Sequence, residues 1–239
     1  SFIEEVMNRS AEAGVLDEVT MTLSLQAREH RGLQARNAIA VIPGAREETI
    51  VLNAHYDAWF DGAGDNADGL AVLMAMARHF GRDEVELERT LVLIASAGHH
   101  TPGLHGPREA VIMNPDLFDN NVLTFNIEHI AQRNFSPARS VFEDGYREFI
   151  ADSVEAPIVA GITNQAPFLR SLIDEGVQRY GVNFVSGPST MASGEGSGYR
   201  DLGAPVVTAM QASPLYHTTG EVFEVVSEPG LERMARFMR

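Results

Sequence analysis

The sequence contains no cysteine. Disulfide bonds, thiolate metal ligands and a cysteine nucleophile are therefore excluded, and any metal site must use histidine, aspartate and glutamate. Basic residues are also scarce, since 18 Lys and Arg stand against 33 Asp and Glu and give a net charge of −15. Nucleic acids and anionic membranes bind through clustered basic side chains, so we expect neither as a partner.

Long apolar runs are missing as well, since none approaches the ~20 residues that span a bilayer. The first residues, Ser1–Glu5, lack the basic start and apolar core of a signal peptide, so we expect none here. The chain begins with serine rather than methionine, as a processed or trimmed product would, and its compartment stays open. Hydrophobic residues make up 44% of the chain, which predicts a packed globular core.

Most of the chain alternates between strand-like and helix-like runs, which is typical of an α/β fold. The run Thr90–Ala95 is apolar throughout, as in strands that are buried on both faces. We therefore predict a mixed, mostly parallel central sheet with helices on both faces. The predicted strands are 37–43, 48–54, 90–95, 121–127 and 205–210, and the predicted helices are 66–80, 105–113, 167–180 and 231–239.

Residues 1–36 differ from the rest and are predicted to form a separate N-terminal segment before a catalytic domain over 37–239. Within this segment we expect a helix over 1–14, a strand over 21–27 and a polar linker over 28–36. Two further stretches carry weak signals. Residues 130–163 show only weak strands near 140 and 148, and 187–198, rich in glycine and serine, predicts a loop.

Polar residues follow the ends of four predicted strands. Because the carboxyl ends of parallel strands meet at one edge of a sheet, we expect these side chains to lie together. Histidines and carboxylates at such an edge are typical of a metal site. The residues are His55 with Asp57 and Asp65, then His99 and His100, then Glu128 and His129, and finally His217.

Three segments carry a resemblance to a known family: Ala54–Asp57, Gly62–Gly69 and Tyr216–Thr218. They resemble the signatures of the co-catalytic zinc aminopeptidases of clan MH, relatives of glutamate carboxypeptidase II, glutaminyl cyclase and the transferrin receptor. The resemblance extends from about Asn37 to Val226 and implies a zinc exopeptidase-like fold. Residues 1–36 resemble the tail of the protease-associated domain that often precedes this catalytic domain.

The resemblance implies a role for each matching residue. His55 would bind one metal, and Asp57 would orient it by accepting its other ring N–H. Asp65 would bridge two metals, which lie roughly 3.5–4 Å apart in such sites. His217 would bind the second metal.

The chain departs from the family where the general-base glutamate and a ligating glutamate usually stand side by side, because it has His99 and His100 there. Glu128 likewise replaces a ligating aspartate. The expected ligands are thus His55, Asp65, His100, Glu128 and His217. This set has fewer carboxylates than the family's, so it compensates the positive charge of two metal ions less well. We therefore expect one firmly bound zinc and a second at partial occupancy.

His99 has three open interpretations: it replaces the general base, it is a further ligand, or it is structural. We favour the base, because a neutral imidazole can accept a proton. Glu195 and Tyr199, which stand for an aspartate and a phenylalanine of the family, are candidate substrate-binding residues. His105 and His129 have no family role to carry over, so we expect them beside the site or on the surface.

These residues predict a metal-dependent hydrolase of the aminopeptidase or exopeptidase type, which uses metal-activated water to cleave an amide bond in a peptide or an N-acyl amino acid. Two alternatives stay open. One is a catalytically degenerate relative that only binds a partner, as the transferrin receptor does, which the missing glutamate pair favours. The other is single-zinc amide chemistry of the glutaminyl cyclase type. The retained His55, Asp65 and His217 favour an enzyme.

Overall fold

The computed structural model describes residues 2–14, 22, 24–139, 147–163, 167–189 and 192–239. The chain divides into two compact units, residues 1–34 and 35–239. In the first unit, helix α1 (Phe2–Glu12) forms as predicted. The predicted strand over 21–27 is wrong for residues 22 and 24–27, and Met21 and Leu23 lie outside the described residues. A strand needs a neighbour to satisfy its backbone hydrogen bonds, and no described residue of this unit supplies one.

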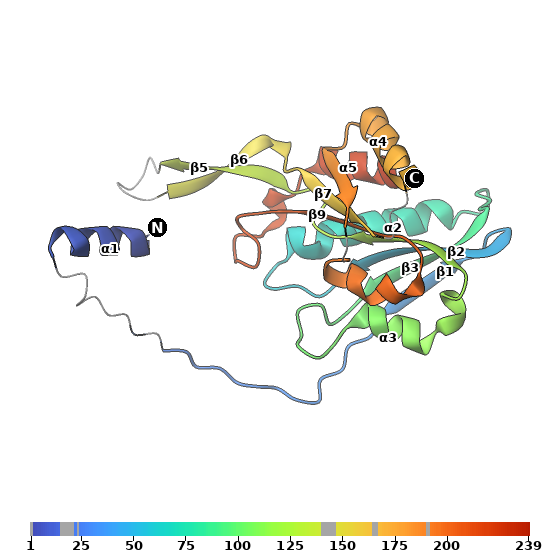
Figure 1. Ribbon diagram of the computed structural model, residues 1–239, viewed down its shortest axis with the longest axis horizontal. Helices are drawn as coiled ribbons and strands as arrows, with labels where there is room; N and C mark the ends of the chain where they lie inside the picture. The colour runs from blue at the N-terminus through green and yellow to red at the C-terminus, as the bar shows by residue number, and fades with distance from the viewer. Residues whose placement is uncertain (1, 15–21, 23, 140–146, 164–166, 190–191) are drawn as a thin grey trace. The chain divides into compact units, whose positions relative to one another are not determined.

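The second unit contains a seven-stranded sheet in the order β1-β3-β2-β4-β9-β7-β8 (Figure 1). Its neighbours pair in parallel except β1 with β3 and β7 with β9. The predicted mixed, mostly parallel sheet is thereby confirmed. The strands are β1 (Ala38–Ile42), β2 (Arg46–His55), β3 (Arg89–Ser96), β4 (Asn121–Ile127), β7 (Ile158–Ile162), β8 (Phe184–Pro188) and β9 (Val206–Gln211).

Helices cover both faces of this sheet, because successive strand side chains point to opposite sides. Leu52 belongs to a core shared with helices α2 (Asp68–Phe80), α4 (Pro167–Tyr180) and α5 (Glu228–Met238). Its neighbour Val51 belongs to a second core, which the other face shares with helix α3 (Gly106–Met113) and the 3-10 helix η4 (Gly194–Leu202). Two shorter 3-10 helices, η3 (Pro115–Leu117) and η5 (Phe223–Val225), lie in the connections. Among the described residues, no helix is long and apolar enough to span a bilayer.

Three regions differ from the prediction. The weak strands near 140 and 148 correspond to β5 (Arg133–Arg139) and β6 (Arg147–Glu155), which form a separate antiparallel pair. Strands β7 and β8 were not predicted. The loop predicted over 187–198 is wrong for residues 187–188, which belong to β8, and from Gly194 onward, where η4 begins. Helix η4 packs against β9 at Gly196, where a side chain would not fit. A Cβ on Gly196 would lie 2.4 Å from Thr208 Oγ1.

The sheet order explains how distant segments meet. Strands β3, β2, β4 and β9 are consecutive neighbours and all parallel. His55, the last residue of β2, lies opposite Ser96, the last residue of β3. Ile127, the last residue of β4, lies opposite Ala209 in β9. The segments that follow these four strands therefore start at the same edge of the sheet.

A partly buried ion pair connects the end of β6 to α5. The carboxylate of Glu155 accepts hydrogen bonds from the hydroxyl of Ser227, which caps α5, and from the guanidinium of Arg233. Burial on its own raises the pKa of Glu155, but these two partners outweigh it and hold the pKa below its ordinary value of 4.5. The carboxylate therefore stabilises the fold at neutral pH and loses that effect as the pH falls through its folded pKa.

Glu155→Gln is expected to lower the free energy of unfolding by roughly 1 kcal/mol at pH 7. The difference should shrink at an acidic pH below the folded pKa of Glu155, where the wild-type carboxyl is also protonated. Urea unfolding at both pH values measures this. Glu232→Gln is the matched control, because its partner Arg236 is exposed and such pairs contribute little. An equal difference at both pH values would contradict the role given to the Glu155 charge.

Candidate metal centre

Asp65 lies at the centre of a cluster of imidazoles. It belongs to the turn η2 (Ala63–Ala67), which precedes α2 and has non-helical backbone angles at Asp65 and Asn66. Its side chain is buried. His55 Nε2 and His129 Nε2 lie 3.0 and 2.7 Å from its Oδ1. His100 Nε2 and His217 Nε2 lie 3.2 and 3.0 Å from its Oδ2. One carboxylate thus stands between two pairs of imidazoles, which is the arrangement of a bridging ligand.

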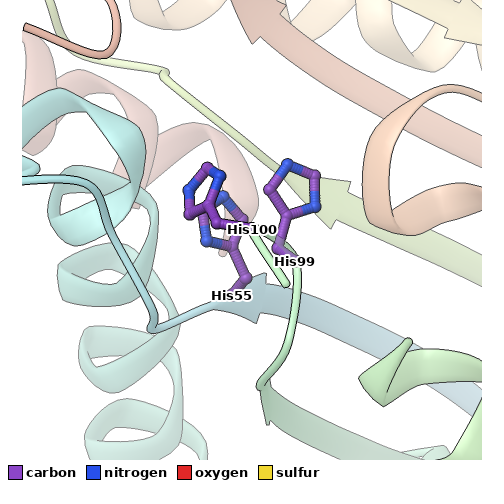
Figure 2. A group of neighbouring side chains, drawn as sticks. All are labelled: His55, His99 and His100. Atoms are coloured by element: carbon purple, nitrogen blue, oxygen red, sulfur yellow. The ribbon is translucent and has the colours of Figure 1, made fainter. Parts of the chain in front are cut away.

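The ligand atoms of these residues lie close enough together to hold metal ions. Among the described residues, three groups have all their ligand atoms within 4.8 Å of one another. The first is His55, Asp65 and His129, and the second is Asp65, His100 and His217. The third joins His55 and His100 with His99 (Figure 2).

The donor set fits a cation. His55 Nε2 and His100 Nε2 are buried and have no hydrogen-bond partner among the described residues, although each lies near Asp65. A buried nitrogen without a partner is costly, and bound metal ions would satisfy these two nitrogens. Nitrogen and carboxylate oxygen are ligands that zinc accepts.

Charge in the cluster is concentrated on Asp65 and His129. Burial on its own raises the pKa of Asp65, but the imidazoles of His129 and His55 outweigh it and hold the pKa well below its usual range. Burial lowers the pKa of His129, but the hydrogen bond with Asp65 and nearby carboxylates raise it to about 9. Burial instead lowers the pKa of His100 to about 4. A proton on His129 thus balances Asp65 in the metal-free chain, and a metal would compete with that proton.

Asp57 orients His55 differently from the prediction. His55 Nδ1 lies 2.9 Å from the backbone oxygen of Asp57 and 3.9 Å from its carboxylate. The carboxylate instead accepts the backbone N–H of His100 at 3.0 Å. Asp57 therefore contacts both His55 and the backbone of His100. Its carbonyl, rather than its carboxylate, fixes the ring of His55.

His129, next in sequence to the expected ligand Glu128, lies against Asp65 in the structure. Glu128 is buried, lies outside the three groups, and its Oε1 accepts hydrogen bonds from Asn126 Nδ2 and from the backbone N–H of Glu195. The sequence predicted that His129 would lie beside the site or on the surface, and its contact with Asp65 agrees with the first of these positions. The sequence pattern that could have indicated His129 is its position, because Glu128 and His129 both follow the end of β4.

Asn66, in the turn η2, and Asp68, the first residue of α2, hold the segment that carries His129. Asn66 Oδ1 accepts the backbone N–H of His129 at 3.2 Å, and its amide donates to the backbone oxygen of Ile127. Asp68 Oδ2 accepts the backbone N–H groups of Ile130 and Ala131. The turn that contains Asp65 and the turn that contains His129 are therefore fixed to each other.

His99 lies at the edge of the cluster, with its ring stacked on that of His55 at 4.3 Å (Figure 2). Its Nδ1 lies 3.2 Å from Glu195 Oε1. Burial lowers the pKa of His99, but the contact with Glu195 and the charges of Glu128 and Asp65 outweigh it and raise the pKa above 6.5.

The two candidate substrate residues are buried instead of facing solvent. Tyr199 is 0% exposed and donates its hydroxyl to Asn53 Oδ1, and Glu195 is 1% exposed. Both belong to η4, whose inward face packs against the sheet. Trp59 is half exposed, and its ring lies 6.0 Å from that of His100 and 6.3 Å from that of His217, so it borders the centre from outside. His105 contacts Ser197 and has no contact with the centre.

The fold and this donor set define an α/β protein with a candidate two-metal centre at the carboxyl edge of its sheet. The chain belongs to peptidase family M28, whose model matches residues 37–239. The family resemblance predicted from the three segments is thereby confirmed. No curated protein matches the chain.

Solved structures of similar fold include aminopeptidases. BSAP, a zinc aminopeptidase from Bacillus subtilis, has 17% sequence identity and a TM-score of 0.64 over 84% of this chain and 48% of that chain. An aminopeptidase from Aneurinibacillus sp. strain AM-1 has 17% identity and a TM-score of 0.64, with 84% and 45% covered. LapA aminopeptidase of Legionella pneumophila has 15% identity and a TM-score of 0.64, with 84% and 52% covered. The chain spans about half the length of these proteins, and the likeness is one of fold.

Proposed function

We propose that the chain is a metal-dependent hydrolase of the aminopeptidase or exopeptidase type, which cleaves an amide bond in a peptide or an N-acyl amino acid. The strongest support is the convergence of four imidazoles on the buried carboxylate of Asp65, with two buried nitrogens that lack a partner. A scaffold that only binds a partner has no need of this arrangement. Membership of a peptidase family supports the same reaction class.

We propose zinc as the metal, held by His55, Asp65 and His129 at one position and by Asp65, His100 and His217 at the other. Imidazole-rich ligand sets favour zinc, copper or nickel over magnesium or calcium. When bound, the metal would polarise the scissile carbonyl and make water a better nucleophile.

Metal content should be uneven between the two positions. Asp65 is the single carboxylate in the two described groups that contain it, so two dications there would share little compensating charge. We expect one zinc per chain to bind firmly and a second to reach only partial occupancy. Plasma mass spectrometry of protein purified without chelator measures this, and two tightly held equivalents would contradict it.

The chain's own residues would handle the proton. His99 is the candidate base, because its ring lies beside the cluster and one of its nitrogens is free of Glu195. As the water oxygen bonds to the carbonyl carbon, His99 would take the water proton. As the carbon–nitrogen bond breaks, His99 would return that proton to the leaving amine nitrogen.

A second candidate function is binding without hydrolysis. One observation favours it: histidines 99 and 100 stand where the family usually has its glutamate pair. Cyclisation of the glutaminyl cyclase type is a third candidate, which needs a single zinc.

Amine release from a panel of aminoacyl, dipeptide and N-acyl amino acid substrates tests these candidates. For the hydrolase we expect release that a chelator abolishes and added zinc restores. His105→Ala is the matched control and should keep this activity, since His105 contacts Ser197 away from the centre. If zinc-loaded protein releases no amine from any substrate, the hydrolase proposal fails. Cyclised product without hydrolysis would instead support the cyclase.

A further inference from the structure

Glu195 is a buried carboxylate held in one orientation. Its side chain is 1% exposed, and Oε2 accepts a hydrogen bond from the hydroxyl of Ser96 at 2.6 Å. Its backbone N–H donates to Glu128 Oε1 at 3.0 Å, which fixes the first turn of η4 to the end of β4. The remaining oxygen, Oε1, lies 3.2 Å from His99 Nδ1. Glu195 thus contacts the imidazole but is too deeply buried to contact a substrate in solvent.

This contact selects one form of the His99 ring. An ionised carboxylate only accepts hydrogen bonds, so Nδ1 must carry the proton and donate it. In a neutral imidazole the other nitrogen, Nε2, then keeps its lone pair. Stacking on His55, at 4.3 Å and 17° between the ring planes, holds the ring of His99 in place (Figure 2).

We propose that Glu195 is the positioning residue of His99: it fixes the tautomer that leaves Nε2 free beside the metal centre to accept a proton. This inference rests on the proposed function, in which His99 is the base. It also gives a role to Glu128, which anchors the backbone of Glu195 through a hydrogen bond. The missing family glutamate is thereby replaced by a histidine and a carboxylate acting together.

Glu195→Gln separates this role from a structural one. The glutamine keeps the shape of the side chain, but its amide can donate to Nδ1 and move the ring proton to Nε2. In zinc-loaded protein we expect kcat to fall on the order of 10²-fold and KM to change within about twofold, with zinc content unchanged. Glu195→Asp retains the charge and should recover part of kcat. His105→Ala is the control, because His105 contacts Ser197 in the same 3-10 helix and should leave kcat unchanged.

Three results would overturn the proposal. The first is a wild-type kcat in Glu195→Gln. The second is an equal loss in the Gln and Asp variants, which would indicate packing rather than charge. The third is loss of zinc in Glu195→Gln, which would make His99 a ligand instead of a base.

A spectroscopic measurement keeps the inference separate from the proposed function. The 15N chemical shifts of the His99 ring in zinc-loaded protein report which nitrogen carries the proton, and His99→Gln identifies the signals. We expect a protonated Nδ1 and an unprotonated Nε2 in the wild type, and the reverse or a mixture in Glu195→Gln. If no substrate is hydrolysed but this pattern holds, the function fails and the positioning of His99 stands. A wild-type Nε2–H tautomer would overturn the positioning itself.

Discussion

Asp65→Asn is expected to remove most of the bound metal. Asp65 belongs to both groups that combine a carboxylate with imidazoles. Each of its two carboxylate oxygens faces a different pair of histidines. Without it, dications would face neutral nitrogens alone. Loss of residues that merely support ligands weakens metal binding 10–100-fold, so loss of a shared ligand should weaken it by more than about 100-fold.

The measurements are zinc content by plasma mass spectrometry and zinc affinity by competition with a chromogenic chelator. Glu128→Gln is the matched control, because Glu128 is equally buried at the same edge of the sheet but lies outside the three described groups. We expect Glu128→Gln to keep its zinc and His129→Ala to lose zinc from one position. Metal content near wild type in Asp65→Asn would refute the bridging role. Loss in Glu128→Gln with retention in His129→Ala would return the ligand role to Glu128.

His99→Ala is expected to lower turnover by 10²–10⁴-fold, the range in which a general base contributes. The effect should fall on kcat, while zinc content stays unchanged, because His55 and His100 each belong to another group that does not need His99. Initial rates on the best substrate of the panel, with metal content measured on the same samples, provide the test. Unchanged turnover would remove His99 from the mechanism.

The core of the fold could be predicted because its signals are local. The apolar run Leu91–Ala95 is buried by neighbours on both faces of the sheet. In Leu123–Ile127 the apolar residues alternate with polar ones and face one core. Strand β7 and helix η4 gave weaker signals. Strand β7 depends on pairing with β8 and β9, and η4 depends on burying Tyr199 against the sheet. Neither partner is near in sequence, so no local pattern marks these elements.

Much of the candidate site could also be predicted from the histidines and carboxylates that follow the predicted strands. His55, Asp65, His100 and His217 were expected to gather, and the structure brings them together around Asp65. Their gathering follows from parallel strands that end at one edge of a sheet. Which ring nitrogen faces which oxygen depends on side-chain orientation, which spacing in the sequence does not encode.

By itself, the sequence determined the fold class, the family and the chemical types available at the edge of the sheet. Only the tertiary structure showed that the ring of His129 lies against Asp65, because adjacent residues at the end of a strand point to opposite sides. His129 has a left-handed backbone conformation with φ of 48°, and in the folded chain its ring lies against Asp65 while Glu128 bonds to the start of η4. The pairing of His99 with Glu195, 96 residues later in the chain, likewise exists only after folding.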